Sequence, residues 1–427
     1  MTRGTDRGRI AGYALINLVV LGSLTVPVVT ALPLRIAELV PAEERASSLA
    51  FVTVCGAIAA LVANPLFGVL SDRTRGRLGR RRPWLLAGVL VGWVASLLVV
   101  IAPSVGMLAV AWTLAQTAYN ASLAAVAALL GDGVSERSRA SASGIFGAAA
   151  FLGTLPPLVL AGVLPSRVDV VVLAMPTAAV LVVAAAVLLL NDPPLAAASA
   201  AARGRLRWPD RDERRALKPF AAVWVQRALM HLSFGLVTSF ALFLVSDRMR
   251  ISPEAAGPVV ALMTFAGGAA IVVSALTSGF LAGRRGDYRP FIVVAALGLA
   301  VASVLRGVGT DTGLLVGGAA LGGLALGAFY AVDLAMALRA VPEGRHGTYL
   351  GVLNMAETLP GTVSPAIASA LLLIGGRDPV SGARDDYLAL CLAAAVVALC
   401  ALLPLPALRG VLTRDRAPEG LSAPVLR

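Results

Sequence analysis

Long apolar stretches alternate with short polar and charged loops along the whole chain. Each stretch has about 20 residues, which is the length that an α-helix needs to cross the hydrocarbon core of a bilayer. The pattern therefore predicts an all-α membrane protein. We predict twelve transmembrane helices, at residues 11–34, 47–70, 84–103, 107–130, 142–164, 170–190, 219–246, 256–282, 290–308, 313–338, 348–374 and 387–408.

The charges in the loops predict the orientation of these helices. An even number of spans places both ends of the chain on one side of the membrane. With that topology, the loops and tails on this side hold 27 of the 36 lysines and arginines, the other side holds 8, and Arg227 falls within a helix. Because cytoplasmic loops are enriched in basic residues, we predict a multi-pass protein of a prokaryotic inner (plasma) membrane with both termini in the cytoplasm.

Composition agrees with this class and argues against others. Apolar residues make up 58% of the chain and charged residues 14%, whereas a soluble domain carries about a quarter charged residues. The net charge of +12 resides in short loops without interleaved aromatic residues, so nucleic-acid binding is not predicted. The chain lacks HExxH, GxSxG and GxxxxGK[ST] motifs, and its three cysteines lack metal-ligand spacing. We expect no enzyme, no cofactor, no metal site and no ATP-driven transport.

The longest cytoplasmic loop, residues 191–218, divides the chain into two parts. It begins with small residues and continues with mixed charge, which is typical of a solvated linker. We therefore predict an N-terminal six-helix half at 1–190 and a C-terminal six-helix half at 219–427.

Two short internal matches indicate that these halves are repeats of one another. Residues 278–290 resemble residues 67–83 at an offset near 211, and residues 343–353 resemble residues 136–146 at an offset of 207. Similar offsets at two places favour two parallel six-helix pseudo-repeats.

The loop after the second predicted helix is dense in arginine: residues 68–83 read GVLSDRTRGRLGRRRP. This loop resembles the loop 2–3 signature of major facilitator superfamily transporters. Its expanded spacing and its RRRP ending are similar to the sugar-carrier branches, the glycoside–pentoside–hexuronide symporters and their sucrose-transporter relatives. The resemblance rests on Gly68, Asp72, Arg73, Gly79, Arg80 and Arg81.

We expect these six residues to act in gating. Asp72 can cap the N-terminus of a neighbouring helix, where the helix dipole favours an anion, and the arginines can reach Asp132 or Glu136 on the next cytoplasmic loop. Such contacts would hold the cytoplasmic side closed in the outward-open state. The alternative is that the arginines only enforce topology and bind anionic lipid headgroups.

Three charged residues deep within predicted helices are candidates for chemistry: Arg227, Asp333 and Glu357. A charge at the bilayer centre costs about 2.5–3.5 kcal/mol on insertion scales, so each is a candidate for proton coupling. The resemblance implies that the first, fourth, seventh and tenth helices line a central cavity, so Arg227 and Asp333 can face each other. A permanent ion pair and a snorkelling Arg227 are the alternatives. The eleventh helix packs mostly behind the cavity in this superfamily, so Glu357 could instead contact Asn354.

Polar and aromatic side chains recur on the fourth predicted helix at spacings that place them on one face. Aromatic rings stack on sugar C–H faces and amides exchange hydrogen bonds with hydroxyls, so this stripe suits a sugar site. A polar packing face between helices is the alternative. His231, one turn beyond Arg227, could likewise be a packing residue. We expect substrate contacts at Asn17, Trp112, Gln116, Tyr119, Asn120, His231 and Tyr330.

One departure from the sugar carriers concerns the coupling ion. Sodium-coupled melibiose-type members use carboxylates within the second and fourth helices, but this chain has Asn64 and Asn120 there and no acid before Asp72 and Asp132. A sodium site is therefore not predicted, and protons are the expected coupling ion.

These features predict a secondary active transporter that moves a sugar or glycoside-like solute by alternating access, as a monomer coupled to protons. A drug or metabolite exporter of the same fold, working as a proton antiporter, is the alternative. An integral-membrane enzyme is a remote alternative, because the sequence shows no cluster of catalytic residues.

Overall fold

The computed structural model describes residues 3–75, 78–164, 167–189, 217–341, 345–373 and 376–413. Helices account for most of these residues. The predicted linker 191–218 lies almost entirely outside the described residues, so the predicted boundaries of the two halves stay a prediction.

The N-terminal helices occupy the first six predicted segments. Four predicted segments, two of them here, are built from more than one helical piece. The pieces are α1 (Arg3–Val26), the π-helix η1 (Pro27–Ala31), α2 (Leu32–Leu39), the short η2 (Ala42–Glu44), α3 (Arg45–Arg73), α4 (Arg82–Ile101), α5 (Val105–Gly133), η3 (Glu136–Ser138), α6 (Arg139–Leu152), α7 (Leu155–Val163) and α8 (Val168–Leu189).

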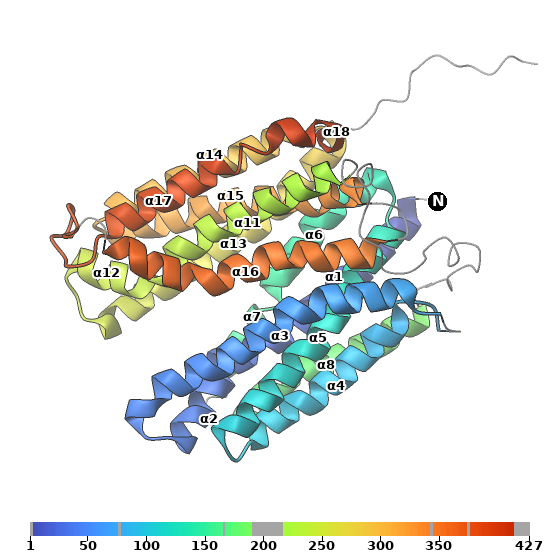
Figure 1. Ribbon diagram of the computed structural model, residues 1–427, viewed down its shortest axis with the longest axis horizontal. Helices are drawn as coiled ribbons and strands as arrows, with labels where there is room; N and C mark the ends of the chain where they lie inside the picture. Colours follow the sequence, from blue (N-terminus) through green and yellow to red (C-terminus); the bar gives the residue numbers. More distant parts are fainter. Residues whose placement is uncertain are drawn as a thin grey trace, which may run out of the picture.

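The C-terminal helices occupy the other six segments and lie together in the upper part of Figure 1. They are α11 (Lys218–Ser239), α12 (Ala241–Met249), α13 (Pro253–Arg285), α14 (Arg289–Val308), α15 (Thr312–Ala340), α16 (His346–Leu372), α17 (Tyr387–Cys400), η4 (Leu405–Leu408) and α18 (Arg409–Leu412).

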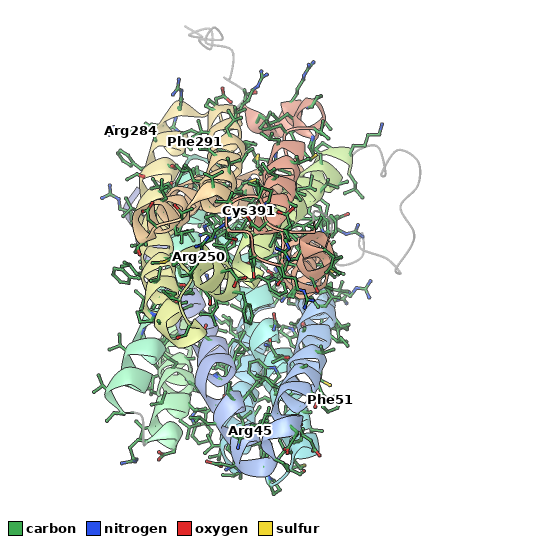
Figure 2. All side chains as sticks on the ribbon, turned by 90° about the vertical axis from the view of Figure 1, so that its left-hand side faces the viewer. Arg45, Phe51, Arg250, Arg284, Phe291 and Cys391 are labelled. Atoms are coloured by element: carbon green, nitrogen blue, oxygen red, sulfur yellow. The ribbon has the colours of Figure 1, made fainter. Side chains whose placement is uncertain are left out.

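The lengths and surfaces of these helices suit a bilayer. Within the described residues, ten helices are long and apolar enough to span a membrane. The remaining two predicted segments are α6–α7, which is interrupted, and the 27-residue α16. Large apolar side chains project from the outside of the bundle, such as Phe51, which is 54% exposed (Figure 2). Exposed apolar side chains of this kind face lipid in a membrane-spanning bundle.

The interruptions have local causes. Pro27 follows α1, and a proline inside a helix removes one backbone hydrogen bond, so the chain continues as the π-helix η1. The break between α6 and α7 falls at Gly153 and Thr154, and Pro156 stands in the first turn of α7, a position that proline favours.

The two groups of helices converge at one end of the molecule, which we name the arginine-loop end because the start of α1 and the loop residues 78–81 lie there. In Figure 1, α3 and α16 approach each other toward this end and diverge toward the opposite end. The approach needs glycine: a Cβ on Gly68 of α3 would lie 2.1 Å from the Gly347 carbonyl oxygen of α16. Similarly, a Cβ on Gly144 of α6 would lie 2.2 Å from the carbonyl oxygen of Ala275 in α13.

Candidate functional site

A cavity of about 550 Å³ lies between the N-terminal and C-terminal helices. Its lining extends from Leu350, near the arginine-loop end, to Thr53 and Val28, nearer the opposite end. The N-terminal wall comes from α1, α3, α5 and α6, and the C-terminal wall from α11, α15 and α16. The two walls differ in chemistry.

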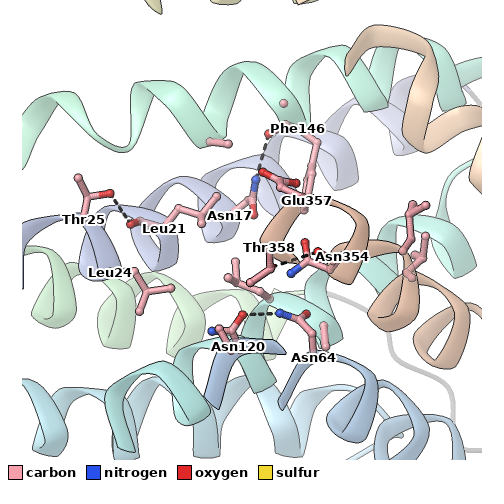
Figure 3. Close-up of a pocket in the computed structure, with 18 of the residues that line it drawn as sticks. Asn17, Leu21, Leu24, Thr25, Asn64, Asn120, Phe146, Asn354, Glu357 and Thr358 are labelled. Carbon is pink, nitrogen blue, oxygen red and sulfur yellow. Dashed lines mark hydrogen bonds between the residues drawn. The ribbon is translucent and has the colours of Figure 1, made fainter. Parts of the chain in front are cut away.

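Uncharged amides and hydroxyls make up most of the polar part of the N-terminal wall. Asn64 of α3 donates a hydrogen bond to Asn120 of α5 (Figure 3). Asn120 in turn donates to the carbonyl oxygen of Gln116 at 2.7 Å and to its side-chain oxygen at 3.1 Å. We call Asn64, Asn120 and Gln116 the amide ladder. On α1, Asn17 donates to the Phe146 carbonyl oxygen at 3.0 Å. The wall therefore offers hydrogen-bonding groups without charge.

The C-terminal wall carries the three intramembrane charges in one cluster. Arg227 of α11 donates to Asp333 of α15 through Nη1 and to Glu357 of α16 through Nη2, the latter at 2.5 Å. Asp333 is buried, with 1% of its side chain exposed, whereas 41% of the Glu357 side chain is exposed. We call Arg227, Asp333 and Glu357 the charge cluster. The predicted pairing of Arg227 with Asp333 is present, and Glu357 is not behind the cavity but on its wall.

Aromatic rings flank the charge cluster. The Tyr330 ring lies 5.8 Å from that of Phe151 and 5.5 Å from that of His231, centroid to centroid. Trp112 reaches the cavity wall but is only 1% exposed, because its ring packs against Gly56. The other aromatic rings at the cavity wall belong to Tyr330, Phe151 and Phe146, none of which is on the fourth predicted helix.

Two predicted substrate contacts lie away from the cavity wall. Tyr119 does not share the cavity face with Trp112, Gln116 and Asn120; it is buried, with its hydroxyl 3.0 Å from Ser96 Oγ on α4. His231 is buried beside Tyr330, and its Nε2 is 3.9 Å from Glu357 Oε2, so it backs the charge cluster instead of lining the cavity.

Asp72 connects the two groups of helices at the arginine-loop end. Its carboxylate accepts hydrogen bonds from the backbone N–H groups of Gly347 at 3.2 Å and Thr348 at 2.6 Å, and from the Thr348 hydroxyl at 2.6 Å. These residues form the first turn of α16, so Asp72 caps that helix where its dipole favours an anion. Arg81 holds the same carboxylate through Nη2 at 2.6 Å.

A second carboxylate extends this network. Asp132, at the end of α5, accepts from Arg80 at 2.6 Å and from Arg81 at 3.1 Å. Its other oxygen lies 2.7 Å from Nδ1 of His346, the first residue of α16. We call Asp72, Arg80, Arg81, Asp132 and His346 the closing network. The arginines thus reach Asp132, as predicted, while Glu136 pairs instead with Arg339 of α15 at 3.3 Å.

The other predicted gating residues have simpler positions. Gly79 has φ of +86°, a left-handed conformation that glycine adopts without strain, so it shapes the loop that delivers Arg80 and Arg81. Gly68 permits the contact with α16, and Arg73 is exposed at the end of α3.

Several cavity residues escaped prediction from the sequence. Polar side chains at single positions and aromatic residues without a charged neighbour gave no signal above that of ordinary packing. They are Thr53, Ser143, Phe146, Phe151, Asn354 and Thr358.

Comparison with known proteins agrees with this architecture. A family model described as "Major Facilitator Superfamily" matches residues 13–267 and 228–425. A 41-residue segment is 49% identical to the sucrose transport protein SUT4 of Oryza sativa subsp. indica, but the match spans 10% of this chain and only 7% of that protein.

Solved structures share the fold over nearly their whole length at low sequence identity. The proton:xylose symporter XylE has a TM-score of 0.72 at 11% identity, covering 94% of this chain and 96% of its own. The human organic anion transporter MFSD10 has a TM-score of 0.69 at 17% sequence identity, and the match covers 96% of this chain and 100% of that one. A bacterial homologue of the iron transporter ferroportin, in an outward-facing state, has a TM-score of 0.70 at 16% identity, and the match covers 94% of this chain and 99% of that one.

The family match covers most of the chain, and the helices, the cavity between two groups of helices and the cross-contacts at one end agree with it. The protein is a multi-pass membrane transporter of the secondary type rather than an enzyme, and it belongs to the Major Facilitator Superfamily.

Proposed function

We propose that the protein is a proton-coupled carrier of a sugar or glycoside-like solute, which it moves across a cell's inner membrane by alternating access. One observation carries the proposal: the cavity sets the amide ladder on one wall against the charge cluster on the other. Amides and rings suit a polyhydroxylated solute, and intramembrane carboxylates suit proton transfer. The short match to a sucrose transport protein and the fold shared with a xylose symporter point the same way.

Within the charge cluster, we assign proton exchange to Glu357. Its side chain is 41% exposed in the cavity, whereas Asp333 is 1% exposed and stays against Arg227. Protonation of Glu357 removes its attraction for Arg227 but leaves Asp333 to neutralise the guanidinium. A loaded cavity would then change its opening without a net charge in the bilayer, which lowers the cost of that step.

The closing network would act as the gate on the cytoplasmic side. Asp72 and Asp132 belong to the N-terminal helices and hold the first turn of α16. Alternating access requires these contacts to break when the cavity opens at the arginine-loop end. We propose that the working unit is a monomer.

Transport by purified protein in proteoliposomes tests the proposal. We expect counterflow of at least one neutral sugar from a panel of mono- and disaccharides, and accumulation of that sugar when a pH gradient is imposed. The Glu357→Gln variant should retain counterflow and lose accumulation, because exchange needs no net proton movement. Extrusion of the solute against the proton gradient would instead identify an exporter. Absence of counterflow for every sugar, at normal protein levels, would contradict the proposal.

A further inference from the structure

We infer that the cavity selects uncharged solutes and rejects anionic ones, and that Glu357 is the residue that sets this selectivity. The inference rests on the proposed function as a sugar carrier and narrows its substrate class to neutral glycosides. Sugars that carry a carboxylate or a phosphate would be excluded.

The first argument concerns the charged residues that line the cavity. Among the described residues that line the cavity, Arg227 is the single cation, and Asp333 and Glu357 are the acids. With both acids ionised, the charge cluster has a net charge of −1. An entering anion would therefore meet a repulsive potential, which is strong in a cavity with apolar walls.

The geometry of Arg227 carries the second step. Tight recognition of a carboxylate or phosphate uses two parallel N–H donors of one guanidinium. In Arg227, Nη1 is engaged by Asp333 and Nη2 by Glu357, and only 11% of the side chain is exposed. Glu357 is far more exposed than the arginine it holds. A solute thus reaches a carboxylate where an anion-binding cavity would present a cation.

The opposite wall does not compensate for this negative charge. The amide ladder and Asn17 are neutral, and their donors are partly used in bonds to one another and to the backbone. From the C-terminal wall, Asn354 and Thr358 add uncharged groups beside Glu357 (Figure 3). Both walls of the cavity therefore offer hydrogen-bonding groups that suit hydroxyls, and neither wall offers a free cation that would bind an anion.

Sugars of matched shape test the selectivity. Methyl β-D-glucoside and methyl β-D-glucuronide differ only at C6, and galactoside and galacturonide form a second pair. In competition with the counterflow substrate, each uronide should bind at least about tenfold more weakly than its glycoside, which is ~1.4 kcal/mol. Glu357→Gln should reduce the difference in affinity between each glycoside and its uronide. The control Glu38→Gln, which alters an exposed glutamate outside the cavity, should leave it unchanged. Equal binding of uronide and glycoside would overturn the inference while leaving the sugar carrier intact.

A second measurement needs no substrate and so stands even if no sugar binds. In a background in which Cys55, Cys391 and Cys400 are replaced by alanine, Thr358→Cys places a thiol in the cavity. Its reaction rates with a cationic trimethylammonium-ethyl and an anionic sulfonatoethyl methanethiosulfonate are compared with those of free 2-mercaptoethanol. We expect the ratio of the cationic to the anionic reaction rate to be at least about tenfold higher at Thr358→Cys than at the free thiol. Glu357→Gln should remove this preference for the cationic reagent. A ratio equal to that of the free thiol, or one unchanged by Glu357→Gln, would overturn the inference.

Discussion

Arg227 and Asp333 stabilise each other at the level of single residues. Asp333 is almost fully buried with Arg227 as its ion-pair partner, so Arg227→Gln leaves its carboxylate unpaired, whereas Asp333→Asn leaves Arg227 paired with Glu357. We predict that Arg227→Gln reduces the free energy of unfolding by about 3–5 kcal/mol, the range for broken buried pairs, and that Asp333→Asn reduces it by less. Unfolding of the purified protein in detergent measures the effect.

The double variant Arg227→Gln/Asp333→Asn decides whether the two residues are coupled. We expect it to lose less stability than the sum of the single variants, because the buried carboxylate that Arg227→Gln leaves unpaired is absent from the double variant. A second pair, Arg284→Gln with Asp333→Asn, serves as the control, since Arg284 is exposed and stacks on Phe280. Additive losses for Arg227 and Asp333 would show that they act independently.

The sequence predicts some of these residues better than others. Opposite charges within two helices are costly enough to identify both residues as candidates, and the family resemblance implied that Arg227 and Asp333 can face each other. The stripe on α5 shows the limit. At about 100° per residue, Gln116 and Asn120 lie about 40° and 80° from Trp112 on one side, but Tyr119 lies about 20° away on the other. The cavity takes in only the amide side, and Tyr119 packs against α4. The width of the exposed sector depends on neighbouring helices, which the sequence of one helix does not show.

At the scale of elements, helix existence is predictable but helix interruption is only partly so. Pro27 and Pro156 account for two of the interruptions. The break between α11 and α12 falls at Phe240, without a proline or an adjacent glycine. There, Thr238 and Ser239 donate their hydroxyls to backbone carbonyls three or four residues earlier, a contact that often bends helices. The signal is present in the sequence but is too common to identify one break.

The contact of α16 with α3 depends on glycine. A Cβ on Gly351 would lie 2.5 Å from the Asn64 carbonyl oxygen and 2.7 Å from Pro65 Cα, whereas one on Gly361 of the same helix meets nothing within 4 Å. Gly351→Ala should therefore push α16 away from α3 and favour opening at the arginine-loop end. We predict that a cysteine at Ala140, 1% exposed at this end, then reacts about tenfold faster with a thiol reagent, a shift of ~1.4 kcal/mol.

Gly361→Ala is the matched control for this prediction, because it makes the same chemical change on the same helix. It should leave the labelling rate of Ala140→Cys unchanged. If both alanine variants behave alike, the close contact at Gly351 does not set the balance between the two openings.

At the scale of the whole molecule, the fold was predictable because each helix that crosses the bilayer needs an apolar segment of about 20 residues. Every predicted span coincides with one helix or with consecutive helical pieces. The direction in which the cavity opens was not predictable from composition, because it depends on which cross-contacts are closed. The structure closes those of Asp72 and Asp132 at the arginine-loop end.

The orientation of the whole molecule in the membrane follows from its cations, and we predict that the arginine-loop end faces the cytoplasm. Fusions of alkaline phosphatase at the C-terminus should be inactive, and fusions in the loop near Asp378 should be active, because that enzyme needs the periplasm. Fluorescent-protein fusions at the same two sites should give the opposite pattern. Periplasmic activity at the C-terminus would reverse the assignment.

Movement of the two groups of helices can be tested with one crosslink between them and one within a group. Ser141 of α6 and Gly283 of α13 face each other at the arginine-loop end, since a Cβ on Gly283 would lie 3.1 Å from Ser141 Oγ. Disulfide formation requires Cβ atoms about 3.5–4.5 Å apart, so paired cysteines can bridge this contact with little movement.

If alternating access separates these helices, oxidised Ser141→Cys/Gly283→Cys should lose at least about nine-tenths of its transport rate, because the cavity cannot open at this end. Reduction should restore the rate. The control Ala302→Cys/Gly322→Cys joins α14 to α15 within the C-terminal helices, where a Cβ on Gly322 would lie 3.5 Å from Ala302 Cβ, and its oxidation should leave transport unchanged. Full transport by the oxidised Ser141–Gly283 variant would show that the helices stay together at the arginine-loop end throughout the cycle.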